Sequence, residues 1–315
     1  MGRYVLRRLL LSIPVLFIAS ILIFGAVRVM PGDICQIVLQ IPVPAEEQCN
    51  NLRHELKLDK PAVSQYFHWI GGVLTGDFGT SFFSKRPVGG EIQQHMSTTI
   101  ELAVLSIFFA FASGVPIGVY SALKQDKLAD VVLRGISIGW LSMPSFWVGT
   151  MLITFPAKWW GYSPPVGYTH FWNDPLKNLE QLYLPAISLG LALSAILARF
   201  TRSAMLEVLR QDYVRTARAK GLRERVVVSE HALKNAMLQV IVHLGLQVAF
   251  FLGGTVVLEY LFALPGLGTL LYNSVITKDF PLVQGLVLVF AAIIVITNLA
   301  IDLSYAWLDP RVKYT

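Results

Sequence analysis

Long apolar stretches dominate the chain, separated by shorter polar and basic segments. Six of them reach, or nearly reach, the roughly 20 mostly apolar residues that a helix needs to cross the hydrocarbon core of a bilayer. They are Leu9–Val27, Leu102–Leu123, Gly135–Ala157, Gln181–Ala198, Asn235–Leu258 and Phe280–Ile301. The fourth is the weakest, because it is short and contains Pro185. Since only helices and closed barrels satisfy the backbone inside lipid, the pattern predicts an all-α membrane protein with six spans in a single domain, residues 1–315.

A seventh uncharged stretch, Tyr260–Thr277, follows the fifth span and contains Pro265, Gly266 and Gly268. These residue types break helices and permit turns. Such backbone is tolerated at membrane depth only where protein or a water-filled cavity surrounds it. We therefore expect a re-entrant or interfacial hairpin over residues 260–278, with an ordinary extracytoplasmic loop as the alternative.

The distribution of lysine and arginine predicts the orientation, because cytoplasmic loops carry an excess of both. Leaving aside Arg28 at the border of the first span, the segments on the side of the N-terminus hold 17 of these residues and the other side holds eight. This places both termini in the cytoplasm. The basic N-terminus and the apolar run after it resemble a signal peptide, but the run is long and lacks an A-x-A-like site, so we expect an uncleaved span.

The first outer segment, residues 28–98, is the largest polar piece and is too small for much of a core of its own. The stretch Leu52–Leu58 is expected to be helical, ending before Pro61. Both cysteines, Cys35 and Cys49, lie here in a compartment that favours oxidation. A disulfide between them is the expectation, with two buried free thiols as the alternative.

Composition agrees with a membrane protein and excludes several other classes. The chain is 54% hydrophobic and only 15% charged, with a mean hydropathy of +0.57 and a net charge of +6. Its basic residues cluster in a few loops, which favours a membrane protein over a nucleic-acid binder. No Gly-Lys pair forms a P-loop, no GxSxG motif is present, and the histidines and cysteines show no metal-binding spacing. We expect no metal site, no catalytic residues and no cofactor in this chain.

Two ionisable residues of the fifth span were weighed as functional candidates. His243 lies in an apolar run, where a packing histidine is the more common case than a proton carrier. Glu259, at the outer end, is the better candidate for facing a transport pathway. Its alternative is an interfacial carboxylate that reaches water.

The most informative segment is the cytoplasmic loop between the fourth and fifth spans, residues 199–238. Nine basic residues against four acidic ones give the loop a net charge of +5. Asp212 suits the positive N-terminal end of a helix, and Gly221 suits the left-handed position that ends one. Arg218 and Lys220 lie in the last turn, where cations are favoured. A second helix is expected to begin near Arg223 and to continue into the fifth span.

The first of these helices would form a small knob near the membrane surface. Tyr213, Thr216, Ala217 and Lys220 share one face at three-to-four spacing. Such a knob suits docking into a groove of a soluble partner, while binding to anionic lipid is the alternative. The residues alone leave these two interpretations open.

This loop resembles the EAA loop of ABC importer permeases, in the form found in the dipeptide and oligopeptide permease B family. Its core residues here are Tyr213, Arg215, Thr216, Ala217, Arg218, Ala219 and Gly221. Arg215-Thr216-Ala217 stands where the wider superfamily has Glu-Ala-Ala, and Gln239 stands where a proline often closes the motif. Further elements occur in the family's order along nearly the whole chain: Pro31-Gly32-Asp33, Gly76-Asp77-Phe78-Gly79, Met143-Pro144-Ser145-Phe146-Trp147, Leu264-Pro265-Gly266-Leu267-Gly268 and Asp309-Pro310-Arg311.

The resemblance implies a type I ABC importer permease fold in the cell inner (plasma) membrane. It implies a second homologous permease subunit, two cytoplasmic ATPase subunits that use ATP and Mg, an extracytoplasmic substrate-binding protein, and contact with lipid but not with nucleic acid. Coupling to the ATPases would rest on one set of residues: Asp212, Tyr213, Arg215, Thr216, Ala217, Arg218, Lys220 and Gly221. The pathway and its outer gate would involve Glu259, Leu264, Pro265, Gly266 and Gly268.

Other classes remain as alternatives at this point. A secondary transporter would show inverted repeats and ionisable residues at the midplane, and we find no convincing repeat. A membrane enzyme lacks a supporting constellation, and a scaffold would only recruit a partner. Within the resembled family, peptides are the expected substrates, while nickel chelates, glutathione and sugars are the alternatives.

Overall fold

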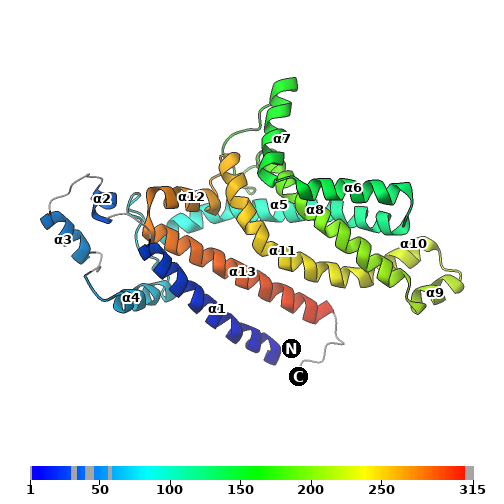
Figure 1. Cartoon of the computed structure of the whole chain (residues 1–315), viewed down its shortest axis with the longest axis horizontal. Coiled ribbons are helices and arrows are strands. Elements are labelled where there is room, and N and C mark those ends of the chain that lie inside the picture. Colours follow the sequence, from blue (N-terminus) through cyan, green and yellow to red (C-terminus); the bar gives the residue numbers. More distant parts are fainter. Residues whose placement is uncertain (1, 30–33, 40–45, 56–58, 309–315) are drawn as a thin grey trace.

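The computed structural model describes residues 2–29, 34–39, 46–55 and 59–308, and nearly all of them are helical (Figure 1). The helices are α1 (Gly2–Val29), α2 (Ile34–Leu39), α3 (Glu46–Glu55), α4 (Ala62–Leu74), α5 (Val88–Leu123), α6 (Leu128–Ser142), α7 (Ser145–Trp160), α8 (Pro175–Leu209), α9 (Asp212–Ala219), α10 (Glu224–Val226), the π-helix η1 (Val227–Leu233), α11 (Lys234–Leu261), α12 (Leu267–Thr277) and α13 (Phe280–Leu308).

Several of these helices are long and apolar enough to cross a membrane. In the described part of the chain four pass this test: Leu6–Val29, Val88–Leu123, Pro175–Leu209 and Phe280–Ile301. The bent pair α6 and α7 makes a fifth if it is counted as one span. α11 is a continuous helix of 28 residues over the predicted fifth span. The all-α membrane architecture is therefore confirmed, and the count of six spans stays a prediction.

The prediction that the third span, Gly135–Ala157, is a single continuous helix is wrong. The structure divides it into α6 and α7, which meet at an angle of 97°. Met143 is extended, as the residue before a proline tends to be, and Pro144 supplies no N–H to continue the hydrogen-bond ladder. Figure 1 shows α6 alongside α5 and α8, while α7 turns away from all three.

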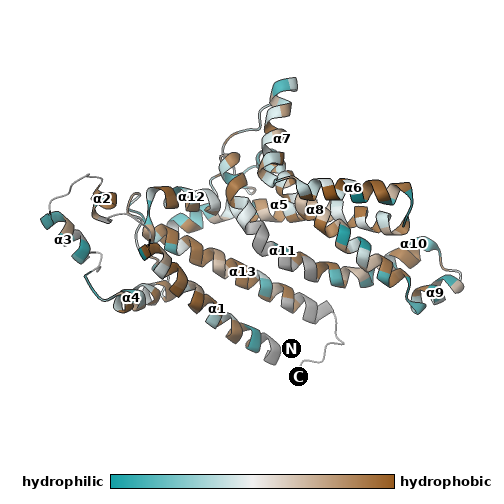
Figure 2. Ribbon diagram, in the orientation of Figure 1, coloured by the Kyte–Doolittle hydropathy of each residue, from teal (hydrophilic) through white to brown (hydrophobic). Residues whose placement is uncertain are grey.

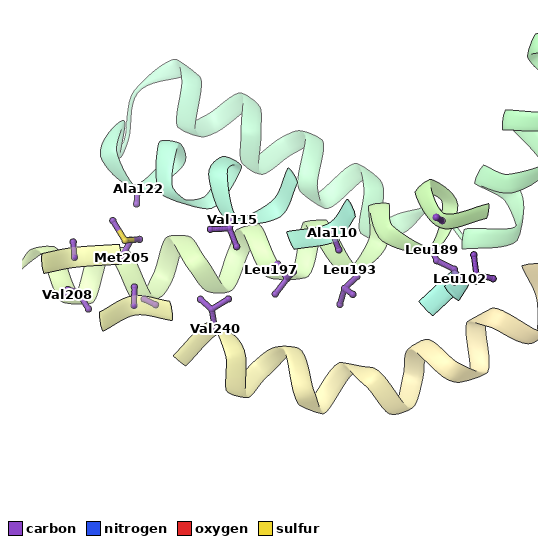
Figure 3. Close-up of a cluster of buried hydrophobic side chains, with 14 of the residues drawn as sticks. Leu102, Ala110, Val115, Ala122, Leu189, Leu193, Leu197, Met205, Val208 and Val240 are labelled. Atoms are coloured by element: carbon purple, nitrogen blue, oxygen red, sulfur yellow. The ribbon is translucent and has the colours of Figure 1, made fainter. Parts of the chain in front are cut away.

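α8, which covers the span predicted to be weakest, is the most buried of the four candidate spans in the described part of the chain. It runs for 35 residues, and 72% of its span window is buried, against 17% for α1. Leu193, Leu197 and Met205 point from α8 into a core shared with α5 and α11 (Figure 3). Pro185 lies inside this helix and is itself buried, so the proline does not end the span.

Small residues let the backbones of α5 and α8 approach closely. A Cβ atom on Gly114 would lie 2.5 Å from the carbonyl oxygen of Ser194, and one on Gly118 would lie 2.5 Å from that of Ala198. The Ser113 hydroxyl donates to Ser194 Oγ across the same contact, at 2.8 Å. Gly114 and Gly118 form a GxxxG pair, which membrane helices use for close packing.

The outer segment forms short helices rather than a separate core. Cys35 in α2 and Cys49 in α3 are joined by a disulfide, with their Cα atoms 5.4 Å apart. α4 packs its Tyr66 against α1, where the Tyr66 hydroxyl lies 2.8 Å from Ser20 Oγ and its ring meets that of Phe24 edge-on. α3 covers the first part of the predicted helix Leu52–Leu58, whose last residues lie outside the described ranges.

Polar and apolar surfaces separate along the molecule. Figure 2 shows hydrophobic residues along α1 and α13, and hydrophilic residues in α3 and α9 at opposite ends of the molecule. Many large apolar side chains of α1 are exposed, among them Leu10, Ile13 and Leu22. This arrangement suits a helical bundle whose middle faces lipid or other membrane helices.

Candidate functional site

The short helix α9 lies within residues 199–238, the loop that resembles the EAA loop of importer permeases. It runs from Asp212 to Ala219, with Gln211 as its N-cap. Asp212 therefore lies in the first turn, where its negative charge interacts favourably with the positive end of the helix dipole. It also forms an ion pair of 3.6 Å with Arg215 on the exposed surface.

Gly221 ends α9 in the left-handed conformation that the sequence predicts. Its φ is +76°, and no atom lies within 4 Å of where a Cβ would be built. The amide of Gly221 donates to the carbonyl of Arg218, and the amide of Leu222 donates to that of Ala217. These two bonds form a Schellman motif around Lys220, the C-cap residue. The backbone conformation, rather than crowding, requires glycine here.

α9 has one buried face and one exposed face. Val214 and Ala217 are buried against the end of α8 and η1, in the same core cluster as Val208 and Val227. The side chains of Tyr213 and Thr216 are exposed, as is that of Lys220 at the C-cap. Ala217 thus lies at the buried edge of its predicted face, beside Val214, while the other three residues of that face are exposed. Val214 is an anchor that was not predicted, although its spacing of three from Ala217 places the two residues on neighbouring turns of one face.

An ion pair ties α9 to the next helix. Arg218 donates two hydrogen bonds to the Glu224 carboxylate, from Nη2 at 2.6 Å and from Nε at 3.1 Å. The hydrogen bonds from Arg218 lower the pKa of Glu224 below its ordinary value, and those to Glu224 raise the pKa of Arg218. Both groups remain substantially exposed, so this pair contributes orientation more than stability.

After the turn at residues 220–223, the chain is helical from Glu224 into α11. α10 begins at Glu224 and passes into the π-helix η1, which α11 follows directly. This agrees with the predicted second helix near Arg223, and Gln239 lies within α11, where it leaves the backbone ladder intact. π-helical turns are rare and occur often at functional sites. α9 is thereby linked to α11 through its contacts with α10 and η1, which continue into α11 without a break.

The opposite end of α11 belongs to a second element, which we call the outer hairpin. It consists of the end of α11, the turn 262–266 and α12. Glu259 is fully buried there. Its Oε2 accepts hydrogen bonds from the amides of Gly268 at 2.7 Å and Thr269 at 3.1 Å, and its Oε1 accepts one from the Thr99 hydroxyl at 2.7 Å. The carboxylate thus caps the N-terminus of α12, whose first amides lack partners within the helix.

Thr99 completes this buried network from α5. Its Oγ1 accepts a hydrogen bond of 2.8 Å from the amide of Leu267, the first residue of α12, while donating to Glu259. The three helices α5, α11 and α12 therefore meet at one carboxylate and one hydroxyl. Leu264 and Leu267 are buried beside them, which excludes water from the network.

The glycines of the hairpin leave room for this carboxylate. A Cβ on Gly266 would lie 2.3 Å from Glu259 Cδ, and a Cβ on Gly268 would lie 2.5 Å from Val256 Cα. Neither glycine has a positive φ, so close approach rather than backbone strain accounts for both. The run from Leu264 to Gly268 is thus a turn built around Glu259, with Pro265 preceding its first glycine.

A second carboxylate fixes the other end of α12. Asp279, between α12 and α13, accepts a 2.5 Å hydrogen bond from the Ser81 hydroxyl and one of 3.2 Å from the amide of Phe82. This contact ties the outer segment to the hairpin. A Cβ on Gly79 would lie 3.9 Å from Pro281, and Phe78 packs against the cluster that includes Leu267 and Leu286.

These positions correct one expectation for Glu259. It was expected to face a transport pathway or to reach water, and the structure instead buries it as the cap of α12. The signal that could have revealed this is a carboxylate within ten residues of a glycine-rich helix start. The backbone of His243 lies in α11, and its side chain lies outside the described part of the structure.

The two sets of candidate residues are not brought together. α9 and the outer hairpin lie at opposite ends of α11 (Figure 1), which is about 40 Å long for 28 residues at 1.5 Å each. No group of three or more histidine, cysteine, aspartate or glutamate residues with metal-binding geometry occurs among the residues the structure describes. The arrangement is that of a membrane bundle with a polar knob at one end and a fixed hairpin at the other.

Comparison with known proteins defines the family. Residues 114–314 match the family of the binding-protein-dependent transport system inner membrane component, and residues 1–103 match its N-terminal region. The chain is 38% identical to the glutathione transport system permease protein GsiC of Escherichia coli strain K12, over the full length of both. It is 39% identical to GsiC of Salmonella typhi, again over the full length of both chains.

Solved structures agree on the fold. An inward-facing form of the MetNI methionine ABC transporter aligns with a TM-score of 0.54 and 20% identity, covering 70% of this chain and 96% of the other. A second crystal form gives a TM-score of 0.54 at 17% identity and covers 69% of this chain and 96% of the other. These similarities are in fold alone.

Fold and family together identify the chain as an integral-membrane permease. It belongs to the family of binding-protein-dependent transport system inner membrane components. As an ABC importer permease it works with ATPase subunits, a second permease and a substrate-binding protein, and subunits of this kind are normally non-catalytic. This membership decides in favour of an importer subunit over a secondary transporter.

Proposed function

We propose that this permease imports small peptides and that α9 is the lever through which ATPase subunits drive it. Both termini and α9 lie on the cytoplasmic side in this proposal, as the excess of lysine and arginine on that side indicates. ATP and Mg bind in the ATPase subunits. A second homologous permease completes the pathway, and two ATPases engage one coupling helix each.

The single observation that carries the coupling role is the construction of α9. Its inner face is fixed by Val214 and Ala217, while Tyr213, Thr216 and Lys220 remain exposed on a helix of only eight residues. A rigid base with an exposed face of polar and aromatic side chains suits docking into a groove of a soluble protein. Because α10, η1 and α11 continue without a break, movement of this knob would be transmitted into the membrane.

The proposed cycle requires two arrangements of the bundle, inward-open and outward-open. ATP binding to the partner subunits drives the change only if it favours one arrangement over the other. The stretch Tyr260–Thr277 and the outer segment 28–98 would meet the binding protein on the outer side. The hairpin would close the pathway there, with Glu259 acting as the internal support of the gate rather than as a contact for substrate.

Peptides are proposed as substrates because the motifs resemble those of the peptide permease family and because relatives identical at 38–39% of positions are named glutathione permeases. Glutathione is itself a small peptide, so the two observations agree in chemical class. Nickel chelates and sugars are the alternatives. Selection among them would rest largely with the binding protein.

Copurification from native membrane tests the proposal. The tagged chain is extracted gently, and proteins that accompany it are identified by mass spectrometry. A second permease and P-loop ATPases are expected, and the complex should show ATPase activity stimulated by binding protein loaded with peptide or glutathione. Recovery without any ATPase, even after crosslinking at α9, would contradict the coupling role. Stimulation only by nickel chelates or sugars would contradict the substrate.

A further inference from the structure

A cavity lies among α5, α6 and α8 near the end of the bundle that carries α9. Its volume is about 280 Å³. Three arginines border it: Arg134 from α6, and Arg199 and Arg202 from α8. None of the residues that line it is acidic. The proposed function does not use this cavity.

The lining changes from polar to apolar along the direction of the membrane normal. In the proposed orientation α5 runs toward the cytoplasm, so its Ser121 lies nearer that surface and Ile117 lies deeper. α6 runs the opposite way, and Arg134 lies nearer the surface while Leu141 lies two turns deeper. On α8, Ala195 is deeper than the arginines. On all three helices the deepest lining residue is therefore apolar, and the arginines and Ser121 lie nearer the cytoplasm.

One of the three arginines is already engaged in holding the helices together. Arg202 donates from Nε and Nη2 to the two oxygens of Asp130, at 2.8 and 2.7 Å. Asp130 is fully buried and also accepts from the Ser121 hydroxyl and the amide of Asp126. This carboxylate is therefore saturated, and Arg202 serves as part of the cavity wall.

The other two arginines keep most of their donors available. Arg134 Nε lies 3.5 Å from Asp130, while 48% of the Arg134 side chain is exposed. Arg199 is exposed, and its guanidinium lies 5.7 Å from the centroid of the Phe200 ring. Guanidinium groups bind phosphate through paired N–H donors. Two such groups above an apolar floor form a site for a molecule with an anionic head and a hydrocarbon tail.

We infer that this cavity binds an anionic phospholipid of the cytoplasmic leaflet. The phosphate lies between Arg134 and Arg199, and acyl chain extends over Ile117, Ile138 and Leu141. Basic residues near this leaflet attract anionic lipids electrostatically. The inference rests on the orientation in the proposed function, but it does not depend on the ATPase partners. A bound lipid would brace α6 against α8 beside the coupling end of the bundle.

A lipid titration tests this inference. The full-length chain, with the subunits that copurify with it, is delipidated in neutral detergent and titrated with fluorescent phosphatidylglycerol. The matching phosphatidylethanolamine probe and inorganic phosphate serve as competitors. We expect selective binding of phosphatidylglycerol, weakened about tenfold or more by R134Q/R199Q. The charge-matched control R210Q/R225Q, which changes two arginines outside the cavity, should leave binding unchanged.

Each other outcome counts against the inference. Equal affinity for the two lipids, competition by phosphate as strong as by lipid, or an equal loss in R210Q/R225Q would overturn it. If R134Q/R199Q does not yield folded protein, R134K/R199K replaces it and should retain selectivity at lower affinity; loss of selectivity there also contradicts the site. An I138C crosslink to the second permease would assign the cavity to a protein interface instead.

This experiment is separable from the test of function. A complex that contains ATPase but shows no preference for anionic lipid overturns the lipid site alone. A chain that binds phosphatidylglycerol selectively but recovers no ATPase overturns the coupling role alone.

Discussion

The two ends of α11 both carry a turn and a short helix, and they are built on opposite principles. At the α9 end, Gly221 has open space around it and is required only for its positive φ. At the outer end, Gly266 and Gly268 have negative φ and are required because Glu259 and Val256 lie too close for a side chain. α9 presents an exposed face, whereas the outer hairpin is closed by buried hydrogen bonds. The difference is that α9 leaves side chains exposed, as the proposed docking to a partner requires, whereas the hairpin satisfies its own polar groups.

The sharpest way to separate the two glycine requirements is a crowding substitution in the hairpin. G268A would place a Cβ 2.5 Å from Val256 Cα and 2.8 Å from Glu259 Oε2. We expect the free energy of unfolding to fall by about 3 kcal/mol, because backbone atoms cannot move aside easily. Thermal unfolding in detergent measures the loss. G253A, in the preceding helix α11 with nothing within 4 Å of the added Cβ, is the control and should unfold at or above the wild-type temperature.

Removal of the capping carboxylate should have the next largest effect. E259A leaves the amides of Gly268 and Thr269 and the Thr99 hydroxyl without their acceptor, at a cost of about 2 kcal/mol. Amide hydrogen exchange in α12 should accelerate while exchange in α9 stays unchanged. E259Q keeps one acceptor oxygen and should lose about half as much. Unaltered exchange of α12 in E259A would contradict the capping role.

A backbone substitution at the α9 end should affect coupling more than global stability. G221V forces a β-branched residue into a left-handed conformation, at a cost of about 1–2 kcal/mol. We expect loss of peptide-stimulated ATPase activity and of transport with little change in thermal unfolding. G221N is the matched control, because asparagine tolerates this conformation, and it should retain most of the activity. Normal coupling in G221V would refute the proposed lever.

The ion pair between α9 and α10 should give the smallest effect. Because Arg218 lowers the folded-state pKa of Glu224, the pair stabilises α9 fully above the ordinary value of 4.5, and this contribution is lost as pH falls through the lowered pKa. The loss should be below about 1 kcal/mol, since both side chains are well exposed. Exchange of the α9 amides, corrected for intrinsic pH dependence, measures it, and E224Q should remove the acid sensitivity. A variant that stays acid-sensitive would point to another group.

Much of the structure around α9 could be predicted from the sequence, because the residues that begin and end this helix lie close together in the chain. Asp212 and Gly221 mark the limits of α9 within ten residues of each other. Asp212 follows the preference for acidic residues in the first turn, and Gly221 follows the preference for glycine just after a helix end. The buried anchor Val214 escaped because its partners on α8 and η1 come together only in the folded chain. These partners are not distinguishable from other apolar residues in the printed sequence.

For the outer hairpin, the sequence predicts the turn but not the hydrogen bonds that hold it. Pro265 and the two glycines indicate a turn. The role of Glu259 as the cap of α12, however, involves Thr99, which lies 160 residues away in the sequence. The break between α6 and α7 at Pro144 could have been predicted from the sequence, because the residue before a proline avoids the helical region. Hydropathy alone obscured it, since α6 and α7 are both apolar and read as a single span.

The most direct test of the central claim is a cysteine crosslink from the exposed face of α9. The native cysteines are joined in the outer segment, so T216C is the single free thiol among the residues that the structure describes. With a short bifunctional reagent, T216C should crosslink to an ATPase subunit, and the yield should change when ATP is added. K127C, in the exposed loop between α5 and α6, should crosslink weakly and without dependence on ATP. Equal crosslinking at both positions, or none at Thr216, would contradict the account of α9 as the coupling helix.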